Sequence, residues 1–324
     1  MEQFMKLREF INLEKIDWGW LSQNPSAIKL LEANQEKIAW DWLSKNPSAI
    51  KLLEANPEKI NWSYLSGNYG AIKLLEANQD QIEWNWLSGN PESTAITLLE
   101  ENQENINWWR LSGNSSSEAI KILEANQEKI DWISLSRNPS AIKLLEANPE
   151  KIYWNMLSRN TSPGAMKLLE ENQENINWQY LSGNPAAMKF LEANPEKIDW
   201  DSLSRNPAPN ALNILEANPE KIVWWRMSYN PAPNALKLLE ANPEKIGWYW
   251  LSLNPSPGAM KLLEANPEKI DWTYLSLNPA IFEYDYKAMK DRMYNSGLFE
   301  DLMKNRFHPR NVLKFEEWGH EGIF

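Results

Sequence analysis

The sequence of 324 residues contains no cysteine and only two histidines, His308 and His320, both in its final segment. The absence of cysteine excludes a disulfide framework and any thiolate site, and it favours a reducing, intracellular setting. A metal role for His308 would need further ligands that the surrounding sequence does not supply, and a histidine before Pro309 suits capping or packing. We therefore expect no metal and no cofactor.

Positive charge is also scarce, because 33 Lys and Arg face 44 Asp and Glu, which gives a formal net charge of −11. This balance argues against a nucleic-acid partner, since a phosphate backbone is bound by clustered Lys and Arg. Apolar runs fall far short of the roughly 20 residues that span a bilayer, and the opening MEQFMKLREF lacks an apolar signal core. We expect a cytoplasmic protein that is neither secreted nor bound to membranes.

Tryptophan, in contrast, is abundant and evenly spaced. Successive members of one series lie 22 or 24 residues apart, a period typical of a solenoid in which each repeat closes its apolar face against the next. We call them the ladder tryptophans: Trp18, Trp40, Trp62, Trp84, Trp108, Trp132, Trp154, Trp178, Trp200, Trp224, Trp248 and Trp272.

Residues 46–68, NPSAIKLLEANPEKINWSYLSGN, show one repeat clearly. Each of its two Asn-Pro steps precedes about eight to ten helix-compatible residues, and Asn suits a helix cap while Pro suits the first helical position. In the first run the apolar residues share one arc of a helical wheel, with Lys51 and Glu54 on the other side. The second run has apolar residues on two sides, including Trp62, so we expect it to be wedged between neighbours.

These features predict an all-α fold, an α-solenoid of stacked two-helix repeats of 22 or 24 residues with helical end caps. We expect an N-terminal cap at 1–11, about eleven to twelve repeats in 12–279, and a C-terminal helical cap at 280–324. The last of these should break near Gly297 and end in a short helix from His308. Layers about 8–10 Å apart would form an elongated rod or arc on the order of 100 Å long. Burial of the ladder indoles would hold successive helical hairpins in one continuous stack.

Three polar positions recur in every repeat. The Ser before the loop begins its series at Ser22, the Asn two residues later at Asn24, and the other Asn at Asn12. Identical amides at one height in successive repeats can bond each other's loop carbonyls and N–H groups, which satisfies backbone that a tight stack buries. We predict two Asn ladders and one Ser ladder. Nucleophilic catalysis is not expected, since no His or Cys in the repeat would activate a serine.

The connection between the Asn24-type residue and the following Ala varies in length. Five connections are short and six carry two extra residues, as in NPESTA and NPAPNA. Insertions confined to one loop leave the stack in register and place the varied loops along one rim, where solenoids often bind. Neutral variation in exposed loops is the alternative.

The position two residues after each ladder tryptophan mixes large aromatic residues with Ser and Arg. A buried site would not tolerate that mixture, because replacing Trp by Ser opens a costly cavity, so we expect partial exposure. Aromatic residues and Arg are favoured at binding hot spots, whereas the alternative is packing across adjacent repeats with a wet edge. With large residues one position earlier, the candidate partner-binding residues are Trp20, Trp42, Tyr64, Trp86, Trp109, Arg110, Tyr180, Trp225, Arg226, Tyr249, Trp250 and Tyr274.

Charged residues repeat as well, with a Lys series from Lys29 and a Glu series from Glu32, three residues apart on the first helix of the repeat. Such pairs stabilise a helix by only a few tenths of a kcal/mol, so we expect a solvated outer face. A carboxylate repeated in identical surroundings also lacks the special environment that acid–base catalysis requires.

Repeats of the form NPSAIKLLEANPEKINWSYLS, the exit LSLNPAIFEYDYKAMKDRM and the final FHPRNVLKFEEWGHEGIF resemble an uncharacterised repeat family encoded by giant nucleocytoplasmic DNA viruses. The resemblance covers nearly the whole chain, and the final segment extends it beyond the repetitive part. It implies expression in an infected host cell and a host-facing or virion-associated binding role. It assigns no activity to particular residues.

We expect a non-enzymatic scaffold that binds a protein through the second-helix face and adjoining loops. A structural component of a virus particle or viral factory is a second hypothesis, which predicts ordered polymers. A third is an enzyme with chemistry in 280–324, where both histidines lie, and it requires a deep pocket with converging polar groups. The sequence leaves the oligomeric state open.

Overall fold

The computed structural model describes residues 5–306, and the predicted all-α solenoid is confirmed there. Contacts divide the chain into two compact bodies: the repeat body, Asn12–Ile281, and the terminal body, which combines Met1–Ile11 with Phe282–Phe324. The short helix expected from His308 lies outside the described residues. Within them, no helix is long and apolar enough to cross a bilayer.

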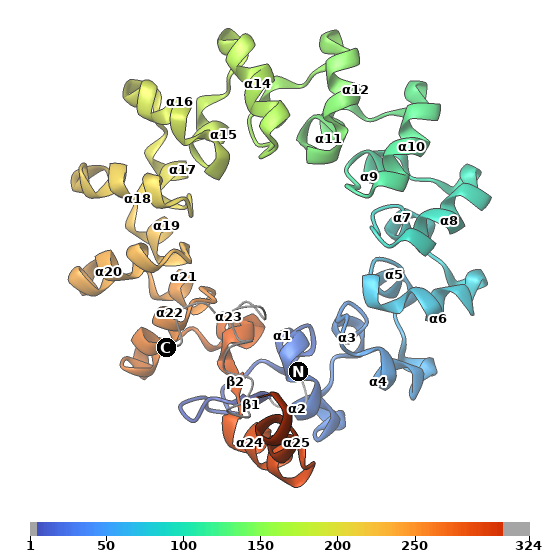
Figure 1. Ribbon diagram of the computed structural model, residues 1–324, viewed down its shortest axis with the longest axis vertical. Coiled ribbons are helices and arrows are strands. Elements are labelled where there is room, and N and C mark those ends of the chain that lie inside the picture. The colour runs from blue at the N-terminus through green and yellow to red at the C-terminus, as the bar shows by residue number, and fades with distance from the viewer. Residues whose placement is uncertain (1–4, 307–324) are drawn as a thin grey trace. The chain divides into compact units, whose positions relative to one another are not determined.

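Among the described residues, twelve inner helices each begin at a ladder tryptophan, and eleven outer helices with the AIKLLEAN-type sequence lie between successive inner helices along the chain (Figure 1). The inner helices are α1 (Trp18–Ser22), α3 (Trp40–Leu43), α5 (Trp62–Ser66), α7 (Trp84–Leu87), α9 (Trp108–Ser112), α11 (Trp132–Arg137), α13 (Trp154–Leu157), α15 (Trp178–Ser182), α17 (Trp200–Ser204), α19 (Trp224–Tyr229), α21 (Trp248–Ser252) and α23 (Trp272–Leu277). The outer helices are α2 (Ile28–Glu32), α4 (Ile50–Glu54), α6 (Ile72–Glu76), α8 (Ser93–Glu101), α10 (Ser117–Ala125), α12 (Ile142–Ala147), α14 (Pro163–Glu171), α16 (Met188–Ala193), α18 (Pro209–Glu216), α20 (Pro233–Ala241) and α22 (Pro257–Glu264).

The second predicted helix of each repeat is not continuous. After the second Asn-Pro step, Pro57–Lys59 forms only a 3-10 turn, and Ile60 is extended with φ −70° and ψ 127°. Helix α5 then starts afresh at Trp62, and the side chain of Asn61 accepts a hydrogen bond from the backbone N–H of Tyr64. Such a cap stabilises the new helix start, because a capping residue has non-helical dihedrals. The same break occurs without a cap bond where Ala39 or Val223 precedes the ladder tryptophan, so the cap is not its sole cause.

The two extra residues of the longer repeats are absorbed between the inner and outer helices. Where the connection is short, a 3-10 turn such as Tyr69–Ala71 leads into the five-residue outer helix α6. Where it is long, turn and helix merge into one outer helix, as in α8 with nine residues.

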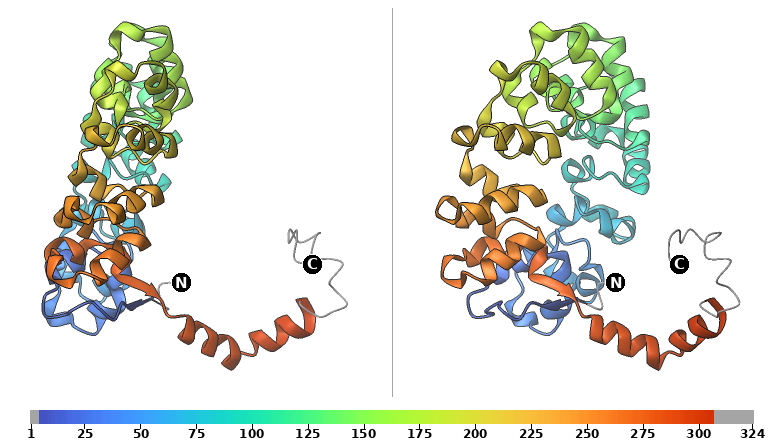
Figure 2. Two further views of the ribbon diagram at one scale, coloured as in Figure 1. Left: turned by 90° about the vertical axis from the view of Figure 1, so that its left-hand side faces the viewer. Right: turned by 60° about the vertical axis from the view of Figure 1, so that its left-hand side comes forward.

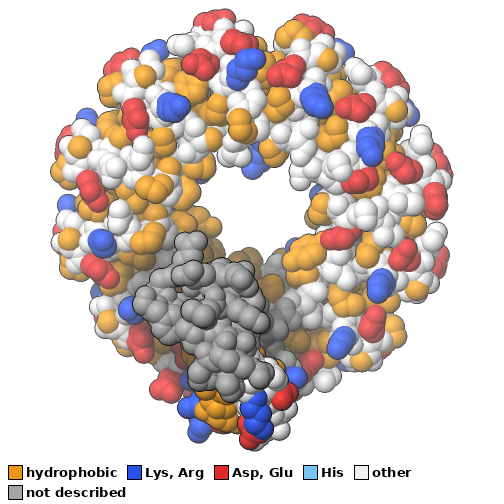
Figure 3. Space-filling view, viewed as in Figure 1, with side chains coloured by type: hydrophobic (Ala, Val, Ile, Leu, Met, Phe, Trp, Pro, Cys, Tyr) orange, Lys and Arg blue, Asp and Glu red, His pale blue; other side chains and the backbone are white. Residues whose placement is uncertain are grey.

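The Lys29 and Glu32 series are exposed on the outer helices, and Figure 3 shows charged side chains around the outer margin. The predicted solvated outer face is therefore confirmed.

The fully buried positions belong to Leu and Ala rather than to tryptophan. Leu65 on the inner helix, Ala49 and Leu53 around the outer helix and their counterparts are 0% exposed or nearly so. Each buried Leu contributes about 1.5–3 kcal/mol before chain entropy is subtracted. The ladder indoles are half-buried, so they contribute to the stack beside this aliphatic core and do not form its centre.

The ladder tryptophans contact lysines of the following repeat. Six pairs, such as Lys59 over the ring of Trp40 at 4.4 Å, join neighbouring repeats with 4.4–4.8 Å between Nζ and the ring centroid. Cation–π contacts at such exposed sites contribute about 0.5–1 kcal/mol each. At these junctions the indoles stabilise the solvent-exposed edge of the contact, while the aliphatic core excludes water from its interior.

One predicted Asn ladder is confirmed. In the series from Asn24 to Asn278 the buried amide Nδ2 donates to backbone carbonyls of the preceding repeat; Asn46, for example, donates to the oxygens of Ser22 and Asn24, both at 3.0 Å. Its Oδ1 accepts from the N–H of Ser48 at 3.0 Å and so begins the next turn. One side chain therefore joins two repeats and starts a helix.

The predicted Ser ladder is also confirmed. Ser22 Oγ donates to the carbonyl of Trp18 at 2.7 Å and accepts from the backbone N–H of Ala39, in the next repeat, at 3.1 Å. The other serines of the series make the same two bonds, including at the long repeats, where Ser88 accepts from the N–H of Asn107.

The second predicted Asn ladder is wrong. In this series the amide bonds within its own repeat: Asn56 Nδ2 donates to the carbonyl of Leu52 at 2.9 Å, four residues earlier. Asn56 thus caps the end of α4 instead of bridging to a neighbour. Its side chain makes no cap bond to the turn that follows, where an N-terminal cap was expected. The amide is only partly buried, because the outer helices leave the end of this turn open to solvent.

The repeat body closes into a ring, where we expected an elongated rod or arc (Figure 1). Helix α1 contacts α23, the N–H of Asp17 donates to Ser276 Oγ at 2.9 Å, and Asn24 Nδ2 donates to the carbonyl of Asn278 at 3.1 Å. Both ladders thus continue across the join without a break. Each of the twelve junctions turns the chain by about 30°, a twelfth of a full turn. Figure 2 shows the repeat body from two further sides, and Figure 3 shows its open centre.

The terminal body contains the strands of the described residues. Strand β1 (Met5–Leu7) pairs antiparallel with β2 (Phe282–Tyr284), and Glu283 forms ion pairs with Lys6 at 3.4 Å and Arg8 at 3.0 Å. The N-terminal segment is therefore not the helical cap that we expected, because it finds a strand partner from the other end of the sequence.

Beyond β2 the terminal body is helical. Helices α24 (Tyr286–Asn295) and α25 (Leu298–Asp301) are followed by a π-turn at Leu302–Arg306. The predicted break near Gly297 is confirmed, since this glycine has φ +71°. Only a residue without Cβ adopts that left-handed conformation at little cost, which is why the helix stops there.

Replacing a buried ladder asparagine should destabilise the fold more than replacing a capping one. Asn160→Ala leaves two carbonyls and the N–H of Ser162 without their partner, so we expect a loss of about 2 kcal/mol or more. Asn148→Ala removes one partly buried bond to Leu144 and should cost about 1 kcal/mol or less. Urea unfolding followed by far-ultraviolet circular dichroism measures both, and equal losses would contradict the assignment.

Ring closure should be visible by energy transfer between dyes, which the cysteine-free chain makes simple to attach. Lys15 lies over the ring of Trp272 at 5.5 Å, so dyes at Glu14→Cys and Thr273→Cys should show nearly complete transfer. The same donor position with Glu128→Cys, far round the ring, should give much less. Low transfer in the first pair would indicate an open arc.

Candidate functional site

The variable positions two residues after the ladder tryptophans lie on the inner helices. They are half-buried, as expected, except for Ser202, which is 2% exposed. Because every inner helix begins at its ladder tryptophan, these positions lie at equivalent places on successive inner helices. The side chain of one repeat therefore lies beside that of the next repeat around the ring. The structure brings all the candidate residues except Tyr180 into one continuous group.

The first part of this group follows the N-terminal repeats. Trp20 stacks on Trp42 with 5.7 Å between ring centroids, and Trp42 stacks on Tyr64 at 5.9 Å. Tyr64 then meets Trp86 edge to face at 6.1 Å. Such offset and edge-to-face pairs contribute about 0.5–1.5 kcal/mol beyond their burial.

The second part comes from the last repeats and joins the first across the ring closure. Trp225 lies 5.0 Å from Trp250, Trp250 lies 4.9 Å from Tyr249, and Tyr249 lies 4.2 Å from Tyr274. Tyr274 reaches Trp20 at 6.4 Å. Because the closure makes this contact, residues from opposite ends of the sequence form one surface. We call the aromatic belt the set Trp20, Trp42, Tyr64, Trp86, Trp225, Tyr249, Trp250 and Tyr274.

An arginine stands at each end of the aromatic belt. Arg110 lies 4.1 Å above the ring of Trp86 and 5.5 Å from that of Trp109, which is 58% exposed. At the other end Arg226 lies 3.8 Å above Trp225 and is held by Asp201, with 2.9 Å between Nη2 and Oδ2. Both guanidinium groups are thus fixed in position by stacking, which costs little conformational freedom on binding.

Lys45 is part of the site, although the sequence analysis did not single it out. Its Nζ lies 4.2 Å from the ring centroid of Trp42 and 4.0 Å from that of Tyr64. Burial against these rings lowers the pKa of Lys45 from its ordinary value. The signal was present in the sequence, since Lys45 is the one lysine at the position between the ladder Ser and Asn.

The aromatic belt is suited to contact with another macromolecule. Its rings are partly exposed, reaching 37% for Trp225 and 39% for Tyr249, and neighbouring rings support one another in fixed orientations. Rigid, amphipathic rings flanked by arginines have the composition and preorganisation of binding hot spots. In the space-filling view, apolar side chains gather on the inner margin of the ring over α3–α7 and α17–α21 (Figure 3).

Tyr180, the remaining candidate, lies in a different environment. The guanidinium carbon of Arg159 sits 3.8 Å above its ring. Both residues line a cavity of about 270 Å³ that also contains Arg137 and Arg205. These three arginines were not predicted as site residues, because single basic residues at a variable position resemble ordinary solvated charges.

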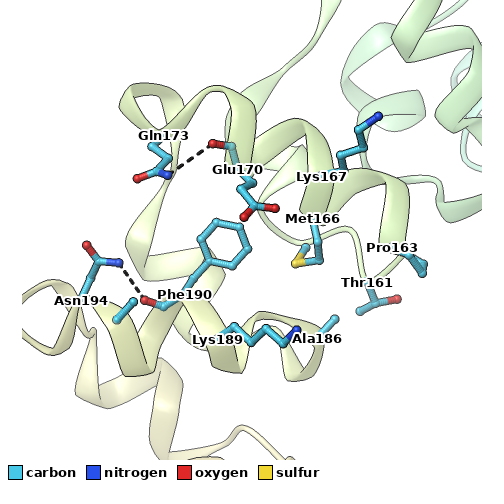
Figure 4. A pocket seen from close by; sticks show the side chains of 11 residues that line it. Thr161, Pro163, Met166, Lys167, Glu170, Gln173, Ala186, Lys189, Phe190 and Asn194 are labelled. Carbon is cyan, nitrogen blue, oxygen red and sulfur yellow. Dashed lines mark hydrogen bonds between the residues drawn. The ribbon is translucent and has the colours of Figure 1, made fainter.

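A larger groove of about 700 Å³ lies on the outer side, between α14 and the next outer turn and helix (Figure 4). Met166 and Phe190 form its apolar floor, and the side chain of Lys167 points away from it. Asn194 Nδ2 donates to the carbonyl of Phe190 at 2.9 Å, so this amide is used within its own helix end. The groove therefore offers apolar contact area without a convergent set of polar groups.

Within residues 5–306, no group of three or more His, Cys, Asp and Glu is arranged to hold a metal ion. The ladder serines donate to helix carbonyls and accept backbone N–H groups, so their hydroxyls are used in the stack. His308 and His320 lie outside the described residues. No protein-family model, curated protein or solved structure matches the chain.

The contact between Tyr249 and Tyr274 should be detectable by titration. A hydrogen bond with Tyr274 raises the pKa of Tyr249 to about 12. Because the folded value exceeds the ordinary value near 10, the bond stabilises the fold below pH 10, and this contribution disappears as pH rises through about 12. Absorbance of tyrosinate near 295 nm should show one late-titrating tyrosine that is absent in Tyr249→Phe and shifts downward in Tyr274→Phe. Unchanged titration curves in both variants would contradict the contact.

Proposed function

We propose that the protein is a non-enzymatic scaffold that binds a protein partner through the aromatic belt. The observation that supports this is the continuity of the belt across the ring closure, with an arginine stacked at each end. A wholly structural set of rings would be expected at every repeat. The other repeats instead carry, at the position two residues after the ladder tryptophan, Arg110, Ser134, Met156, Tyr180, Ser202 and Arg226, of which only Tyr180 is aromatic. The concentration of aromatic residues on part of the ring favours recognition.

The scaffold is assigned to the cytoplasm of an infected host cell, in line with the resemblance to the giant-virus repeat family. A structural component of a virus particle or viral factory is the second candidate. End-to-end polymerisation of a solenoid needs free stack ends, but α1 and α23 cover each other in the repeat body. This pairing favours the scaffold over a polymer of stacked repeats.

Replacing belt tryptophans by serine should abolish partner binding without unfolding the protein. The variant combines Trp20→Ser, Trp42→Ser, Trp86→Ser and Trp250→Ser, all half-buried positions at which other repeats already carry Ser. Since hot-spot residues contribute about 2 kcal/mol or more each, we expect the affinity to fall by at least a hundredfold. Partners captured from infected cells are identified and then titrated, as purified proteins, against the wild type and the variant by calorimetry.

The matched control replaces exposed apolar residues of inner-helix regions outside the belt, Ile133→Ser and Tyr153→Ser, which are 42% and 51% exposed in the wild type. This control should bind as the wild type does. Equal binding by the belt variant would reject the belt as the interface, and loss of helical content in that variant would assign its tryptophans to the core.

A further inference from the structure

The position between the ladder Ser and the ladder Asn differs from repeat to repeat. It is arginine only at Arg137, Arg159 and Arg205, with Gly183 between the last two along the ring. The structure brings these three side chains to one cavity of about 270 Å³, on a part of the ring that the aromatic belt does not include. A protein with a net charge of −11 thus concentrates positive charge at one place.

None of the three arginines forms an ion pair within the described residues. The ion pairs of the repeat body there are Arg226 with Asp201 and Lys167 with Glu171, and the cavity wall contains no Asp or Glu. Converging guanidinium groups repel one another when no anion lies between them. The cavity therefore presents three permanently charged groups whose N–H donors make no hydrogen bond within the described part of the chain.

Neighbouring residues hold Arg159 in place and complete the lining around the other two arginines. Arg159 stacks on Tyr180 at 3.8 Å, which fixes the plane of the guanidinium and leaves its edge available for in-plane hydrogen bonds. Gly183 forms part of the cavity wall next to Arg205, because a Cβ there would lie 3.5 Å from Arg205 Nη2. Thr161 adds a hydroxyl group to the wall. The lining thus combines three guanidinium groups, the hydroxyl group of Thr161 and the ring of Tyr180.

We propose that this cavity, the arginine pocket, binds the dianionic phosphate group of a phosphorylated segment of a partner protein. Planar guanidinium forks match the geometry of phosphate oxygens, and three of them suit a dianion better than a single carboxylate. The pocket is one small, open site on an acidic protein, so it fits an isolated phosphate group rather than a nucleic-acid backbone. The inference rests on the proposed scaffold function and adds a second point of contact.

The test titrates the full-length protein with a synthetic peptide that carries one phosphoserine, and separately with inorganic phosphate and the unphosphorylated peptide. The phosphopeptide should bind by calorimetry, with affinity that rises between pH 5 and 7 as the second phosphate proton, with a pKa of about 6, is lost. Arg159→Gln should weaken binding about tenfold, and the triple Gln variant should abolish it. Lys237→Gln, an exposed basic residue of the outer helix α20 that belongs to neither the pocket nor the aromatic belt, should bind as the wild type does.

Binding that is equally tight for inorganic phosphate would overturn the assignment to a protein segment, and binding that persists in the triple variant would overturn the site. No binding of the phosphopeptide by the wild type rejects the proposal. Thermal melting followed by circular dichroism shows whether the triple variant is folded. If the triple variant is not folded, the affinity of the single variant Arg159→Gln for the phosphopeptide decides the test. The belt variant keeps the pocket and should still bind the phosphopeptide, so failure of the scaffold function and failure of the pocket are distinguishable.

Discussion

The buried amide of the Asn24-type residue determines how one repeat sits on the next. Its two N–H donors reach carbonyls of the preceding repeat while its oxygen starts the following turn, so a single side chain fixes both the distance and the direction of each step. The ladder serine repeats this link in the opposite sense by accepting an N–H from the repeat ahead. Because the same bonds form at short and long connections, the step is uniform. A uniform step gives a closed ring only where its rotation returns to the start, and the contact of α1 with α23 shows that it does so here.

The sequence predicted the architecture from its period but left the closure undetermined. The spacing of the ladder tryptophans identifies the repeats, and the invariant polar positions identify the bonds between them, because a tightly stacked loop must satisfy its buried backbone groups. The angle between repeats depends on how side chains such as Leu65 and Ala49 pack, and no periodicity encodes it. The strand at Met5–Leu7 was missed for a related reason, since its partner lies at the far end of the chain.

The candidate site shows the same division between local and non-local information. Residue type and repeat position identified the members of the aromatic belt, because large rings at a variable, half-exposed position are informative by themselves. Their continuity depends on the contact of Trp20 with Tyr274, which exists only in the closed ring. Lys45 and the arginines of the pocket were missed because a lone basic residue at one position per repeat gains its meaning from neighbours one or two repeats away.

Closure also restricts how the gene for such a protein can change. Open solenoids gain or lose whole repeats by recombination between similar segments, since each repeat contacts only its neighbours and the rest of the array is unaffected. In this ring, the gain or loss of one repeat changes the angle that every junction must adopt for the ring to close. Without that change, the N–H of Asp17 could no longer reach Ser276 Oγ. Copy number is therefore under structural selection, whereas the two-residue insertions in the outer connections, which leave the step intact, remain free to vary.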